Sequence, residues 1–142
     1  MPHKILVVDD DPDILDALSM ILESKGYQVV TAQDGIEGLA TLKAEKPDVM
    51  ILDLLMPKMD GFAVCKELQD PRWSKYKGVP ILILTSVREE ASRRRYELET
   101  GLELDVADYV EKPVSPDVLL GRVEKLIKKK QKSLNLAGEG ST

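Results

Sequence analysis

The sequence is poor in the residues that build several common kinds of functional site. Its 142 residues include one cysteine, Cys65, and one histidine, His3. A single cysteine excludes a disulfide framework within the chain and a cysteine-rich zinc site. A single histidine argues against a histidine-based zinc site and against a Ser-His-Asp triad. Any chemistry is therefore expected to come from carboxylates, hydroxyls and amines.

Long hydrophobic runs and an excess of positive charge are missing too. No apolar run approaches the roughly 20 residues needed to cross a bilayer, and no basic-then-apolar leader precedes the first hydrophobic run. We therefore expect a cytoplasmic protein without membrane contact. Twenty basic residues against 25 acidic ones give a net charge of −5, which argues against direct nucleic-acid binding. The length and the 43% apolar content indicate one globular domain.

Short apolar runs alternate with amphipathic helical patterns along the chain. Buried strands are expected at residues 4–8, 27–32, 49–52, 80–84 and 106–110. Helices are expected at residues 14–22, 34–45, 62–68, from about 88, and at 116–130. This alternation predicts a parallel α/β sheet covered by helices on both faces.

Two segments carry no such pattern. The polar stretch from Pro71 to Gly78 is expected to be a surface loop, with Trp73 and Tyr76 as its anchors. Residues 131–142 are expected to be a mobile tail outside the domain of residues 1–130. That tail is natural, a linker to a further domain, or a remnant of cloning, and the sequence leaves these alternatives open.

Polar residues collect where the predicted strands end. The first strand is followed by Asp9, Asp10 and Asp11, the third by Asp53, the fourth by Thr85 and the fifth by Lys112. In a parallel α/β sheet, ligands bind outside the carboxyl ends of the strands, so these side chains are expected to meet at one edge. Each residue alone has a plain structural explanation. Asp11 before Pro12, for example, suits a helix cap.

A cluster of Asp9, Asp10 and Asp53 would require a cation. At about 5 Å and an effective dielectric constant of about 20, each pair of carboxylates repels by roughly 3 kcal/mol. An all-oxygen site with few protein ligands suits Mg²⁺, which keeps several waters and shares phosphate oxygens. Together with the ammonium of Lys112 and the hydroxyl of Thr85, the cluster has the parts that phosphoryl transfer needs.

Four stretches resemble the receiver domain of two-component response regulators, similar in size to the stand-alone chemotaxis type. They are ILVVDDDPDI (5–14), ILDLLMPKMDG (51–61), ILILTS (81–86) and DYVEKP (108–113), and the resemblance covers residues 4 to about 130. It implies a flavodoxin-like, doubly wound (βα)5 fold with a five-stranded parallel sheet in the order 2-1-3-4-5. It also implies a phosphorylation-dependent switch, and no enzymatic activity beyond the domain's own phosphorylation and dephosphorylation.

The resemblance gives the acidic residues their roles. It implies that Asp53 is the phosphoacceptor. It further implies that Asp9, Asp10, Asp53 and the backbone carbonyl of Leu55 bind Mg²⁺. The implied phosphoryl donor is a sensor histidine kinase or a phosphotransfer protein.

The resemblance also implies how the signal leaves the site. Thr85 would be the switch hydroxyl, Lys112 the phosphate-pairing lysine with a cis bond to Pro113, and Tyr109 the switch aromatic. A downstream protein would sense the change, with the chain a monomer or a phosphorylation-dependent homodimer.

The chain departs from the family pattern in the length between Thr85 and Lys112. The extra residues are expected within 99–105, at the end of the fourth helix or in the loop after it. The run Arg93 to Arg95 in the same segment is expected to be a solvated helix face.

Two other functions compete with a receiver domain. A haloacid-dehalogenase-like Mg²⁺-dependent phosphatase uses a similar residue set, and Asp9 with Asp11 loosely fits its strand-one motif, but the DLLMPKMDG loop (53–61) then has no role. The second is a binding module that works without phosphorylation. A histidine phosphotransfer protein fails because His3 precedes the first strand and lies on no helix.

Overall fold

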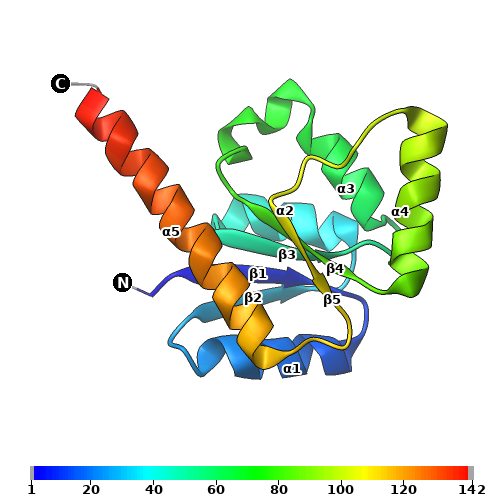
Figure 1. Cartoon of the computed structure of the whole chain (residues 1–142), viewed down its shortest axis with the longest axis horizontal. Coiled ribbons are helices and arrows are strands. Elements are labelled where there is room, and N and C mark those ends of the chain that lie inside the picture. The colour runs from blue at the N-terminus through cyan, green and yellow to red at the C-terminus, as the bar shows by residue number, and fades with distance from the viewer. Residues whose placement is uncertain (1, 141–142) are drawn as a thin grey trace.

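A computed structural model describes residues 2–140, with the side chains of residues 2–134. In this part of the chain, strands alternate with α-helices, and a short 3-10 helix precedes the fourth strand (Figure 1). The elements are β1 (Lys4–Val8), α1 (Pro12–Glu23), β2 (Gln28–Ala32), α2 (Gly35–Glu45), β3 (Val49–Asp53), α3 (Gly61–Leu68), η1 (Pro71–Tyr76), β4 (Ile81–Thr85), α4 (Val87–Thr100), β5 (Asp108–Glu111) and α5 (Pro116–Gly140).

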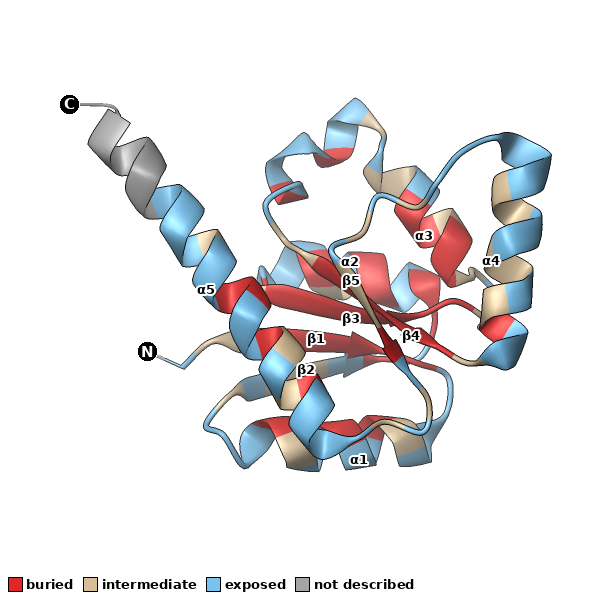
Figure 2. Cartoon of the chain, in the orientation of Figure 1, coloured by how far each residue is buried: buried red, intermediate tan, exposed pale blue. Residues whose placement is uncertain are grey.

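The strands form one parallel sheet in the order β2-β1-β3-β4-β5. This confirms the predicted flavodoxin-like topology. β3 and β4 are buried along their whole length, as Figure 2 shows by their red colour. Their unbroken apolar sequences follow from this burial, because helices cover both faces of the sheet.

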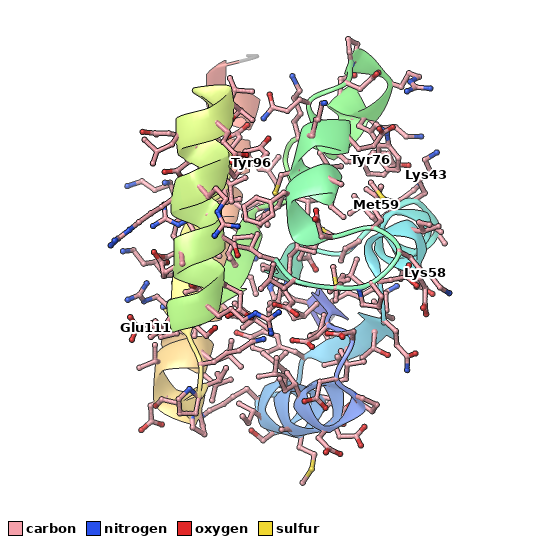
Figure 3. All side chains as sticks on the ribbon, turned by 90° about the vertical axis from the view of Figure 1, so that its right-hand side faces the viewer. Lys43, Lys58, Met59, Tyr76, Tyr96 and Glu111 are labelled. Carbon is pink, nitrogen blue, oxygen red and sulfur yellow. The ribbon has the colours of Figure 1, made fainter. Side chains whose placement is uncertain are left out.

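Two hydrophobic clusters hold the helices to the two faces. α1 and α5 pack on one face through Leu18 and Val123, among others. α2 and α3 cover the other face, where the core includes Leu39 and Val64. α4 joins this second layer through Tyr96, whose ring stacks on Phe62 of α3 with centroids 4.9 Å apart. Figure 3 shows Tyr96 between α4 and α3.

The prediction of a surface loop after α3 was wrong in part. Residues Pro71–Tyr76 form the 3-10 helix η1, and both Trp73 and Tyr76 are buried. Their spacing of three residues places them on one side of a 3-10 helix, which has three residues per turn. The indole Nε1 of Trp73 donates a hydrogen bond to Oε1 of Glu67 at 3.0 Å. The two aromatic residues therefore anchor the segment, as expected.

The last helix was predicted too short. α5 continues to Gly140, ten residues beyond the expected end at Lys130. The side chains of Gln131 to Leu134 are exposed, so no apolar periodicity marks this extension. Leu, Lys, Gln and Ala all favour helix, and no proline interrupts the segment, so helix propensity accounts for the continuation. The expected end of the domain at residue 130 stays a prediction.

The fifth strand and the loop before it carry the remaining differences. β5 spans Asp108–Glu111, slightly later than expected. α4 ends at Thr100 with Gly101 in the left-handed conformation, and residues 101–107 form the connecting loop. The connection between Thr85 and Lys112 therefore contains α4, this loop and β5, and the expected position of its extra residues within 99–105 stays a prediction. Among the helices described, none combines the length and the apolar content that a membrane span requires.

Candidate functional site

The polar residues at the strand ends meet at one edge of the sheet. Asp9 follows β1, Asp53 ends β3 and Thr85 ends β4. These three strands are direct neighbours in the sheet. Lys112 follows β5, and its backbone N–H donates to the carbonyl oxygen of Thr85 at 2.6 Å. We call Asp9, Asp10, Asp53, Thr85 and Lys112 the strand-end site.

Three carboxylates of the strand-end site form a tight cluster. Oxygen atoms of Asp9, Asp10 and Asp53 all lie within 4.8 Å of one another. Asp9 and Asp53 are buried, whereas Asp10 is exposed. Burial raises the pKa of Asp9, and burial together with the Asp9 carboxylate raises the pKa of Asp53 to about 6. The cluster therefore holds negative charge at a cost that a cation would offset.

Lys112 supplies one positive charge to this cluster. Its Nζ lies 3.3 Å from Oδ1 of Asp53, 3.5 Å from Oδ2 of Asp9 and 3.5 Å from Oε1 of Glu89. Burial alone would lower the pKa of Lys112, but the carboxylates of Asp53, Asp9 and Glu89 together raise it. The ammonium is therefore charged at neutral pH and shared among three acids. Its peptide bond to Pro113 is cis, as the resemblance implies.

The cluster fits a hard divalent cation. Oδ2 of Asp9 is buried and, within the described residues, accepts no hydrogen bond, although it lies 3.5 Å from the Lys112 ammonium. A buried carboxylate oxygen without a hydrogen bond destabilises the folded state, and a bound metal ion is a suitable partner for it. The donors are all oxygens, which suits Mg²⁺. The backbone N–H of Leu55 lies 3.4 Å from Oδ1 of Asp53, so the Leu55 backbone is next to the cluster.

The loop between β3 and α3 supports Asp53 by close packing. Asp60 caps α3 by accepting a hydrogen bond from the Ala63 N–H at 2.9 Å. A Cβ atom on Gly61 would clash with the carbonyl oxygen of Asp53, so only glycine fits there. Gly61 then begins α3, one residue before the expected start at residue 62. Figure 3 shows Lys58 and Met59 on this loop, beside α2.

The hydroxyl of Thr85 is directed toward α4. Its Oγ1 donates to Oε1 of Glu90 at 3.0 Å. Nη2 of Arg93 lies 2.7 Å from Oε2 of the same Glu90, and its guanidinium carbon lies 4.9 Å from the centroid of the Tyr109 ring. Thr85, Glu90, Arg93 and Tyr109 therefore form a continuous chain of contacts from β4 to β5.

Sequence reasoning missed three residues around the strand-end site. Glu89 and Glu90 were given no role, and Arg93 was expected on a solvated helix face. Arg93 is instead half-buried, in contact with Glu90, Glu97 and Tyr109. The sequence signal that could have located Glu89 and Glu90 was the N-terminal cap of α4. Ser86 accepts a hydrogen bond from the Glu89 N–H, which places residues 89 and 90 in the first turn, directly after Thr85.

The sequence matches the family described as response regulator receiver domain over residues 5–124. The chain belongs to this family. It is 41% identical over 131 residues to the alkaline phosphatase synthesis transcriptional regulatory protein PhoP of Bacillus subtilis (strain 168), covering 92% of this chain and 51% of that protein. It is 39% identical over 129 residues to the response regulator MprA of Mycobacterium sp. (strain KMS), covering 91% of this chain and 52% of that protein. The receiver domain thus spans about half the length of these relatives.

Solved structures agree with the family. A response regulator from Chloroflexus aurantiacus J-10-fl superposes with a TM-score of 0.76 at 34% identity, covering 90% of this chain and 99% of that one. The chemotaxis protein CheY4 of Vibrio cholerae gives a TM-score of 0.71 at 32% identity, covering 89% and 99%. The chain is thus a receiver domain of the two-component response regulators, and these comparisons are consistent with a phosphorylation-dependent signalling switch.

The phosphatase alternative is not favoured. It would need Asp11 beside Asp9 as part of the reaction site. Asp11 is instead exposed and caps α1, accepting a hydrogen bond from the Asp13 N–H at 2.9 Å. The carboxylates that do meet Asp9 are Asp10 and Asp53.

Proposed function

We propose that Asp53 accepts a phosphoryl group from the phosphohistidine of a sensor histidine kinase or phosphotransfer protein, or from a small phosphodonor. An oxygen of the Asp53 carboxylate forms the new O–P bond. With phosphohistidine the P–N bond breaks and the departing imidazole takes up a proton, whereas with an acyl phosphate a P–O bond breaks and a carboxylate leaves. The observation that carries this proposal is the position of Asp53. The residue is 2% exposed, and its carboxylate lies within 4.8 Å of two further acids and 3.3 Å from Lys112 Nζ.

Asp9, Asp10, Asp53 and the backbone carbonyl of Leu55 are the proposed ligands of Mg²⁺. Bound there, Mg²⁺ supplies positive charge for the oxygens of the transferring phosphoryl group. Lys112 provides the second positive charge, because its ammonium already contacts Asp53. In this proposal the protein catalyses its own phosphorylation and dephosphorylation, and no separate substrate is turned over.

Thr85 and Tyr109 are the proposed switch residues. The phosphoryl group adds a charge of about −1.5 to −2 and three acceptor oxygens, to which the Thr85 hydroxyl can turn. Tyr109 then moves into the space that Thr85 leaves, and a local charge change is converted into a change of the surface around α4 and β5. A downstream protein in the cytoplasm reads this surface, with the receiver domain a monomer or a phosphorylation-dependent homodimer.

The test is labelling with acetyl phosphate, followed by intact mass. We expect one phosphoryl group per chain in the presence of Mg²⁺ and none in its absence. Asp53→Asn should abolish labelling. Asp16→Asn, which makes the same change at an exposed position of α1, should leave it unchanged. Undiminished labelling of Asp53→Asn would mean that the acceptor is misassigned, and absence of any labelling would favour a binding module that works without phosphorylation.

A further inference from the structure

Both groups that the proposed function assigns to the phosphoryl oxygens already have partners on α4. The hydroxyl of Thr85 donates to Oε1 of Glu90 at 3.0 Å, and the ammonium of Lys112 lies 3.5 Å from Oε1 of Glu89. Glu89 and Glu90 are consecutive residues in the first turn of α4. One turn of one helix therefore holds the two donors that phosphorylation needs.

Glu89 is a buried acid with few compensating contacts. It is 7% exposed, and its Oε2 accepts no hydrogen bond from any described residue. Lys112 is its ion-pair partner at 3.5 Å. A buried carboxylate is costly unless it is paired, so Glu89 has a strong requirement for the Lys112 ammonium.

Glu90 is held in place by Arg93 through the carboxylate oxygen that Thr85 does not contact. Nη2 of Arg93 lies 2.7 Å from Oε2 of Glu90, and Nη1 of Arg93 lies 3.0 Å from Oε1 of Glu97. The hydrogen bond from Arg93, aided by that from Thr85, lowers the pKa of Glu90. Glu90 is therefore a charged, well-positioned acceptor, and a hydrogen bond to a charged group is stronger than one between neutral groups.

We propose that Glu89 and Glu90 form a carboxylate clamp that positions Lys112 and Thr85 in the unphosphorylated protein and competes with the phosphoryl group for both. This inference rests on the proposed function. A threonine hydroxyl has one proton, so Thr85 donates either to Glu90 or to a phosphoryl oxygen, but not to both at once. Lys112 has three protons, yet Glu89 would face a new dianion across it. Phosphorylation therefore releases the first turn of α4 from the strand-end site.

Through the carboxylate clamp, α4 affects the phosphorylation equilibrium as well as responding to it. A partner that draws Glu89 and Glu90 away from the strand-end site would free Thr85 and Lys112 and so favour the phosphorylated form. By linkage, phosphorylation would favour binding of that partner by the same factor. The carboxylate clamp thus sets how strongly the receiver domain resists the phosphorylated state.

The experiment measures the Mg²⁺-dependent binding of beryllofluoride, a stable mimic of the phosphoryl group, by fluorine NMR titration. Glu90→Ala removes the competing acceptor, and we expect beryllofluoride to bind about three- to tenfold more tightly, since one hydrogen bond to a charged group is lost from the free form alone. Glu90→Gln keeps a neutral acceptor and should fall between Glu90→Ala and the wild type. Glu89→Gln, which removes the charge facing the bound anion, should also tighten binding. Glu99→Ala, at an exposed position of the same helix, is the control and should match the wild type.

A double-mutant cycle separates the clamp from a simple charge effect. In a Thr85→Val background, Glu90→Ala should have no further effect on beryllofluoride binding, because no hydroxyl is left to release. Binding that is unchanged or weaker in Glu90→Ala, or that tightens equally in the Thr85→Val background, would overturn the proposal. Asp53→Asn tests the proposed function independently, since undiminished binding by that variant would overturn the assignment of Asp53 and not the clamp.

Discussion

Nζ of Lys112 lies 3.3 Å from Oδ1 of Asp53, although the two residues are 59 positions apart in the sequence. The contact exists because β3 and β5 flank β4 in the same parallel sheet and end at the same edge. Lys112 is the one lysine in contact with Asp53 among the described residues, and it also contacts Asp9 and Glu89. Three buried acids therefore depend on a single cation.

Replacing that cation should destabilise the metal-free protein. In Lys112→Met, three buried carboxylates lose their ion-pair partner, and removing one side of a buried pair costs about 3–5 kcal/mol. We expect a lower free energy of unfolding in urea at pH 7 without Mg²⁺. Added Mg²⁺ should restore more stability in Lys112→Met than in the wild type. Equal stabilisation of both proteins by Mg²⁺ would contradict the shared role of the metal and Lys112.

The stability of the metal-free protein should depend on pH through Asp53. Its pKa is about 6 in the folded protein and about 3.9 in an unfolded chain. Between these values the folded state binds more protons, so the free energy of unfolding falls as pH rises from about 4 to about 6 and then levels off. The buried Asp9, whose pKa is also raised, acts in the same direction.

Asp53→Asn should remove most of the fall in the free energy of unfolding between about pH 4 and pH 6. At pH 7 without Mg²⁺ we expect the variant to be about 2–3 kcal/mol more stable than the wild type, with little difference near pH 4. Urea unfolding at the two pH values makes the comparison, and Asp16→Asn provides the exposed control. A difference of the same size at both values would show that the charge of Asp53 is not its cause.

The switch should fail without its hydroxyl while phosphorylation continues. Thr85→Ala keeps Lys112 and the three clustered acids, Asp53 included, so it should still be phosphorylated. It lacks the group that moves toward the phosphoryl oxygens, and so Tyr109 should not be drawn inward. Amide shift maps before and after phosphorylation should show changes at α4 and β5 in the wild type and much smaller ones in Thr85→Ala. Equal changes in both proteins would exclude this mechanism.

The lifetime of the phosphorylated form should be long. In receiver domains, the residues two positions after the acceptor and after the switch hydroxyl flank the path of the attacking water, and here they are Leu55 and Val87. Neither side chain can orient water, and positioning governs such reactions. Leu55 is half-buried, whereas Val87 is 91% exposed, so we expect Leu55 to have the larger effect.

Substitution at these positions tests the lifetime directly. Leu55→Asn should speed the loss of the phosphoryl group severalfold, and Val87→Glu should do so to a smaller degree, as followed by the decay of the phosphorylated mass. Decay of both variants at the wild-type rate or more slowly would mean that these positions do not control the lifetime.

The sheet and the strand-end site could be predicted from the sequence because their signals are local. Continuous apolar runs mark β1, β3 and β4, and polar residues directly follow each of them. The parallel arrangement then brings Asp9, Asp53 and Thr85 together without further information. The helix caps Asp11, Asp34 and Asp60 are local signals too, and all three cap helices in the structure.

The contacts from α4 could not be predicted in this way. Leu98, Glu99 and Thr100 are exposed, and α4 lacks a strong apolar face. The hydrophobic pattern therefore does not determine how α4 is rotated about its own axis, and so which side of it faces the sheet. Only that rotation brings Glu89 to Lys112 and Arg93 to Tyr109. η1 was missed for a related reason, since two aromatic residues in a polar segment are too few to show a period.

The most direct test is to locate the phosphoryl group itself. After treatment with acetyl phosphate and Mg²⁺, borohydride reduces an aspartyl phosphate to homoserine and releases phosphate, and peptide mass spectrometry identifies the altered residue. We expect homoserine at position 53 alone, with Asp9 and Asp10 unmodified. Reduction at another aspartate, or at none in a protein that has taken up the phosphoryl group, would contradict the assignment of Asp53.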